Sequence, residues 1–181
     1  MRRLFRRHIR KTLAQEVPPI LQEANFAFDK GQYGRAGELF EKIAETAAAR
    51  GGPRAPLFYL QAGRARVFAG QTALGMPSLK RGLELLSQER RFLRLHRIRR
   101  RLINELRDRG LEKEAAEVET WTLSPESASS ETELREIPVK RPVLPTHCPS
   151  CGAGVRPDEI EWLDEVTAEC AYCGSPVHAD S

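Results

Sequence analysis

Residues 24–36 read ANFAFDKGQYGRA, and they are the most informative segment for the fold of the N-terminal half. Gly31 lies between two helix-forming segments, which is typical of one helix that ends and another that begins almost at once. The small side chains of Ala24 and Ala36 would let two antiparallel helices approach closely, while Tyr33 and Phe40 fill the space between them. The stretch therefore predicts a helical hairpin.

The same glycine returns twice, because Gly70 and Gly110 follow Gly31 at intervals of 39 and 40 residues. Aligned on these glycines, two further positions repeat, seven residues before and five residues after each: Ala24, Gly63 and Ile103, then Ala36, Gly75 and Ala115. Helices are expected from Pro18 to about Lys30 and near 33–49, 56–69, 72–87, 89–109 and 111–122. The second and third units are less regular, since Gly75 and Pro77 would disturb one helix start.

The hairpin of residues 24–43 resembles a tetratricopeptide repeat (TPR) unit, and the resemblance covers about residues 16–122. It implies a mainly α architecture of TPR-like antiparallel hairpins, an α-solenoid, that binds a protein partner on its concave face. The alternative is an unrelated six-helix bundle. The residues that the resemblance puts near the concave face are Asn25, Arg64, Arg97, Arg100, Asn104 and Arg107.

Asn and Arg side chains on such a face can hold a carboxylate or a peptide backbone, which favours an acidic or C-terminal peptide as ligand. The alternative is that the arginines only solvate a surface.

The four cysteines form two C-x2-C pairs with 18 residues between them: Cys148, Cys151, Cys170 and Cys173. Two such turns can complete a tetrahedral thiolate site. The segment 147–181 resembles a small β zinc ribbon, with one structural Zn²⁺ and a short hairpin between the pairs. Four thiolates leave no position for an activated water, so catalysis at the metal is not expected. Iron and a pair of redox-active dithiols are rival interpretations, and His147 or His178 could replace a ligand.

Charge divides the chain at Leu111. Residues 1–111 carry 24 basic and 10 acidic groups, whereas residues 112–181 carry 5 basic and 15 acidic groups. The basic half, which begins with a predicted amphipathic helix over 1–15, makes an RNA- or ribosome-associated factor the alternative function. A membrane-surface role ranks below both. The acidic ribbon would repel phosphate and more plausibly contacts protein, with Trp162 as its anchor if exposed.

Residues 123–146 are expected to form a linker, flexible at first and then extended through Val139, Val143 and Leu144. Such a linker would let the ribbon unfold without the helices, unless its extended part lies against them. The sequence has no phosphate loop, nucleophile elbow or helix-borne zinc motif. With no signal peptide and no apolar run of membrane-spanning length, a cytoplasmic protein is expected. Together these features predict a non-enzymatic protein-protein interaction adaptor.

Overall fold

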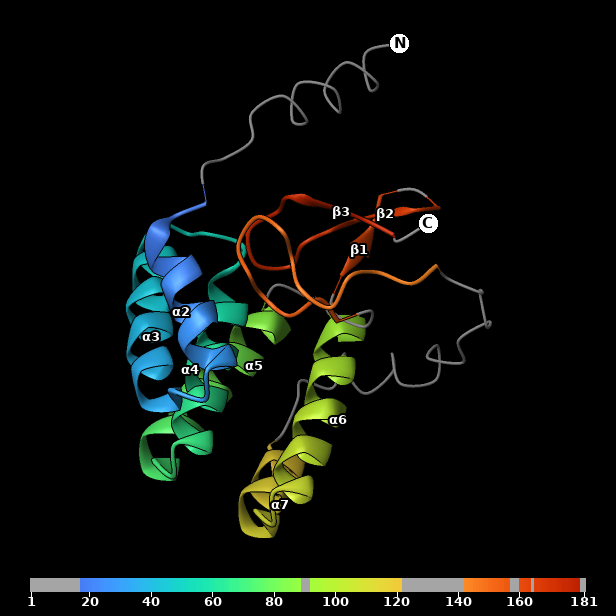
Figure 1. Ribbon diagram of the computed structural model, residues 1–181. Coiled ribbons are helices and arrows are strands. Elements are labelled where there is room, and N and C mark those ends of the chain that lie inside the picture. The colour runs from blue at the N-terminus through green and yellow to red at the C-terminus, as the bar shows by residue number, and fades with distance from the viewer. Residues whose placement is uncertain (1–16, 89–91, 122–141, 157–159, 164, 180–181) are drawn as a thin grey trace.

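The computed structural model describes residues 17–88, 92–121, 142–156, 160–163 and 165–179 of the 181-residue chain (Figure 1). This part is mainly helical, with helices packed against one another and a small antiparallel sheet near the C-terminus. The predicted helix over 1–15 and the linker up to residue 141 lie outside the described residues.

The helices fall close to their predicted bounds. They are α2 (Pro19–Asp29), α3 (Tyr33–Ala49), α4 (Ala55–Phe68), α5 (Thr72–Gln88), α6 (Phe92–Asp108) and α7 (Glu112–Thr120). The strands are β1 (Glu161–Trp162), β2 (Thr167–Glu169) and β3 (Pro176–His178), paired antiparallel in the order β1-β2-β3. The predicted hairpin between the cysteine pairs corresponds to β1 and β2, and β3 extends it.

The repeated glycines are helix terminators of one kind. Gly31, Gly70 and Gly110 have φ angles of 73°, 77° and 73°, a region that glycine enters without steric cost. The residue after each glycine donates its N–H to the carbonyl five positions back: Gln32 to Ala27, Gln71 to Arg66 and Leu111 to Leu106, each at 2.9 Å. These are Schellman caps, so the repeat of the sequence is a repeat of helix-ending turns.

The other repeated positions lie where paired helices touch. Ala24, Ala36 and Ala115 are fully buried. Between α4 and α5 the pair is Gly63 and Gly75, and a Cβ atom built on Gly63 would lie 2.8 Å from the Gly75 carbonyl oxygen. Gly75 therefore does not disturb the start of α5, because its missing side chain is what permits the close contact.

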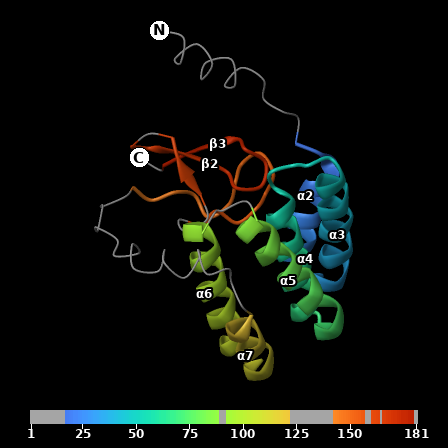
Figure 2. The same cartoon turned by 180° about the vertical axis from the view of Figure 1, so that it is seen from behind.

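The ribbon lies against one end of the helical layer, between α2 and α6, in both opposite views (Figures 1 and 2). One cluster of buried side chains runs from the helices into the ribbon and includes Leu57 and Leu60 of α4 together with Cys151 and Tyr172. Leu144, in the extended stretch before the ribbon, packs against the same cluster. The helices and the ribbon thus share a core.

Within the described ranges, every helix is too short or too polar to cross a membrane.

Candidate metal centre and its seat on the helices

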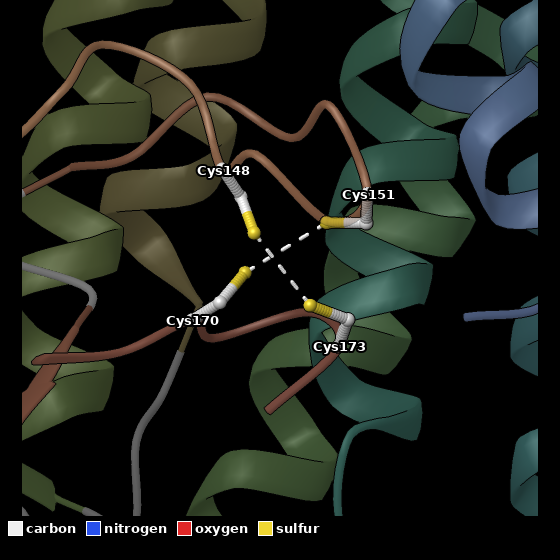
Figure 3. Close-up of side chains that lie close together, drawn as sticks. All are labelled: Cys148, Cys151, Cys170 and Cys173. Atoms are coloured by element: carbon white, nitrogen blue, oxygen red, sulfur yellow. Dashed lines mark hydrogen bonds between the residues drawn. The ribbon is translucent and has the colours of Figure 1, made fainter. Parts of the chain in front are cut away.

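The four cysteine sulfurs converge on a single point (Figure 3). All four Sγ atoms lie within 4.8 Å of one another, with Cys148 3.7 Å from Cys173 and Cys151 3.8 Å from Cys170. These distances are too long for disulfides, whose sulfurs are about 2.05 Å apart. A tetrahedron of sulfurs about 2.3 Å from a central ion has edges of about 3.8 Å, so the cluster could hold one metal ion.

Each cysteine pair sits on a turn built in the same way. The Gly152 and Gly174 amides donate to the carbonyls of Cys148 and Cys170, both at 2.9 Å, and both glycines have positive φ. The Cys148 amide donates to Ala153 at 2.8 Å, and the Cys170 amide makes the corresponding bond to Ser175. The spacing C-x2-C followed by glycine therefore produces two equivalent knuckles that face each other.

The crowded thiols perturb one another. Hydrogen bonds from neighbouring thiols, Cys151 first, lower the pKa of Cys148 to about 6, whereas the bond with Cys148 raises the pKa of Cys151. In the same way the pKa of Cys173 is lowered and that of Cys170 raised. Cysteine binds a metal as the thiolate, so a divalent cation held by the four sulfurs would displace their protons.

Neither histidine belongs to the cluster. His147 Nε2 lies 3.3 Å from Asp29 of α2, and its side chain is half exposed. His178 Nδ1 lies 3.2 Å from the Thr167 hydroxyl across the β2–β3 pair. Both are bystanders to a four-sulfur site.

Two side chains of helix α2 form hydrogen bonds with the backbone of the first knuckle. The buried Asn25 amide donates to the Cys151 carbonyl at 2.9 Å. Gln22, one turn earlier, donates to the Ser150 carbonyl at 3.1 Å. Asn25 is predicted to bind a partner peptide. In the structure its side chain instead forms a hydrogen bond with the backbone of its own chain.

Helix α4 holds the second knuckle. Tyr172, between Cys170 and Cys173, is buried, and its hydroxyl accepts a hydrogen bond from the Gln61 amide. At the start of α4, Arg54 forms an ion pair with Glu169 of β2 at 2.7 Å. Tyr172 also belongs to the buried cluster that includes Leu57 and Leu60 of α4.

Arg64 of α4 and Glu105 of α6 form the polar centre of the contact between the helices and the ribbon. The Arg64 side chain is only 8% exposed, and its guanidinium donates twice to the Glu105 carboxylate, at 2.8 and 2.9 Å. Its third donor reaches the Gln61 amide oxygen at 2.8 Å. Arg156, from the ribbon, donates to the same carboxylate at 3.0 Å. One carboxylate of α6 therefore joins α4 to the ribbon.

The charge of Glu105 is stabilised where it lies. Burial alone would raise its pKa, but Arg64, Arg156 and Arg101 together hold the pKa below its ordinary value. The carboxylate is therefore ionised at neutral pH and balances the buried arginine.

The predicted partner-binding residues separate into two groups. Asn25 and Arg64 lie on the face that carries the ribbon, whereas Arg97, Arg100, Asn104 and Arg107 line a hollow between α6 and α7. The residues of α6 near Arg64 are instead Ile98, Arg101, Leu102 and Glu105. The structure therefore does not bring these four α6 residues to the face that holds Asn25 and Arg64, and their role in binding a partner stays a prediction.

Trp162 is half-buried in β1, opposite Ala168 of β2. The sequence interpretation missed Gln22, Gln61, Glu105, Arg156 and Tyr172. The signal for the two glutamines was their spacing, since each lies three residues before a predicted residue, Asn25 or Arg64, and so shares its helix face.

No protein-family model, curated protein or solved structure matches this chain.

Proposed function

We propose that the protein is a non-enzymatic protein-protein interaction adaptor, made of TPR-like helical hairpins and a structural zinc ribbon docked upon them. The single observation that carries the proposal is the contact between α2 and the first knuckle. There the Asn25 amide, on the face where a TPR-like layer binds peptides, is hydrogen-bonded to a polypeptide backbone.

The chemistry of the four sulfurs supports zinc as the resident metal. Thiolates are soft ligands, and a closed tetrahedral set of four suits Zn²⁺ in a structural role. The ribbon has only three short strands in its described part, which is too little apolar surface to fold without an added constraint. Zinc would supply that constraint by fixing the two knuckles against each other.

The position of the docked ribbon changes where a partner is expected to bind. Because Asn25, Gln61 and Arg64 form hydrogen bonds within the chain, the helical face that carries them is already occupied by the ribbon. The adaptor would therefore use the outer face of the ribbon and the helical surface beyond it. In this proposal the ribbon is an interaction module, and it also occupies the helical face on which it is docked.

The metal is tested by elemental analysis of protein purified without added metal. We expect one zinc per chain, lost in Cys170→Ser and kept in the matched knuckle variant Ser150→Ala. Iron in place of zinc, or equal metal content in both variants, would reject the structural zinc site.

The interaction role is tested by affinity purification of the tagged full-length chain, with and without nuclease, in moderate salt. Retention of one protein partner after nuclease treatment supports the adaptor. The high positive charge of residues 1–111 favours the alternative, an RNA- or ribosome-associated factor, and loss of all partners on nuclease treatment would replace the adaptor with it.

A further inference from the structure

A basic hollow of about 420 Å³ lies between α6 and α7, on a side of α6 that does not contact the ribbon. It is lined mainly by arginine, histidine and amide side chains, together with one carboxylate: His96, Arg97, Arg99, Arg100, Asn104, Arg107 and Glu119. We propose that this hollow binds an acidic peptide segment of the partner protein through its carboxylates. The inference rests on the proposed adaptor function and names the surface and chemistry that it would use.

Two of the arginines are held in position by α7. Arg99 donates to the carbonyls of Val118 and Glu119, which are in the last turn of that helix. Arg107 pairs with the Glu119 carboxylate at 2.7 Å. Because these side chains are already ordered, a ligand that meets them loses less conformational entropy on binding.

The exposed members form one row on the surface of α6. Arg100 and Asn104 are four residues apart, and both are exposed beside the half-buried Arg97. An arginine offers a planar fork of donors that matches a carboxylate, and the Asn104 amide can both donate to and accept from a peptide backbone. Ile103 is buried and also lines the hollow, so an apolar side chain packs beside Arg100 and Asn104.

The charges around the hollow favour a short acidic segment over a continuous polyanion. The α7 residue that lines the hollow is Glu119, which pairs with Arg107, and the Glu112 carboxylate lies 3.7 Å from the same arginine. A phosphodiester chain that crossed α6 here would meet these two carboxylates and be repelled. A peptide needs only one or two carboxylates in the hollow and can leave it with uncharged residues.

The test is fluorescence anisotropy of the full-length protein with two labelled probes, a short peptide of Glu and Ala and an oligouridylate of equal charge. We expect the peptide to bind, and Arg100→Ala to weaken it about tenfold, the loss of one charge-assisted hydrogen bond. The matched control is Arg81→Ala on α5, which removes one exposed positive charge outside the hollow and should leave peptide affinity unchanged.

Equal losses of peptide affinity in Arg100→Ala and Arg81→Ala would overturn the proposal, because they would indicate attraction by the overall positive charge rather than by the hollow. Absence of peptide binding, or a tighter complex with the oligouridylate, would overturn it too. Failure of the adaptor function is recognised separately, because it is the loss of every protein partner after nuclease. A partner that survives nuclease and is retained equally by wild type and Arg100→Ala would refute the hollow and leave the adaptor intact.

Discussion

Replacement of Glu105 by glutamine is the perturbation that most directly tests how the ribbon is seated. Glu105→Gln preserves the size of the side chain and removes the charge that balances Arg64 and Arg156. Removal of one partner from a buried ion pair costs about 3 to 5 kcal/mol. Because the Glu105 side chain is 22% exposed, water offsets part of this cost, and we expect a loss of about 2 to 3 kcal/mol in the free energy of unfolding.

The assay is urea unfolding followed by circular dichroism at neutral pH, with Glu84→Gln as the matched control. Glu84 is 47% exposed and lies 3.8 Å from Arg81, so its exposed pair should contribute less than about 0.5 kcal/mol. If Glu105→Gln cost no more than Glu84→Gln, the reasoning about the Arg64–Glu105 centre would be refuted.

The pH dependence gives the same experiment a second readout. The pKa of Glu105 is lowered in the folded state, so its contribution is present above the unfolded pKa of about 4.3 and is lost as pH falls through the folded pKa. Acid also protonates the cysteine thiolates and destabilises both proteins, so the effect of Glu105 is the difference in the free energy of unfolding between wild type and Glu105→Gln. That difference should have its full value at pH 7 and shrink below about pH 4. A difference that did not change with pH would contradict the role given to the Glu105 charge.

Three further predictions follow from the packing and the metal centre. Cys170→Ser should release the metal and also lower the melting temperature of the helices, because the ribbon shares their core; an unchanged helical melt would show that the two parts are decoupled. Ala36→Leu should cost about 1 to 3 kcal/mol by overpacking a fully buried position, as measured by thermal unfolding. The control is Gly34→Ala, whose added Cβ would have no atom within 4 Å. Gly63→Ala should cost at least as much as Ala36→Leu, because its Cβ would meet the Gly75 carbonyl oxygen, and a neutral result would mean that α4 and α5 are farther apart.

The ribbon's docking alters one expectation drawn from the sequence. The Ser- and Glu-rich first part of the linker predicts that the ribbon can unfold alone. The buried Asn25–Cys151 bond joins residues 126 positions apart, and the Gln61–Tyr172 bond joins residues 111 positions apart. Contacts at such separations leave no periodic trace in the sequence, so the composition of the linker could not report them.

Local sequence patterns specify the helices, their turns and the four cysteines that could bind a metal ion. Each depends on spacing over a few residues: a glycine ends a helix at Gly31, Gly70 and Gly110, and C-x2-C pairs place two sulfurs on one turn. The face of α6 that meets α4, and the position of the ribbon against α2 and α4, could be read only from the folded chain. One residue of register turns a helix by about 100°, and the repeat in α6 was too degenerate to fix that angle. The partners of Glu105, from α4 and from the ribbon, were therefore selected by packing between distant segments rather than by any local pattern.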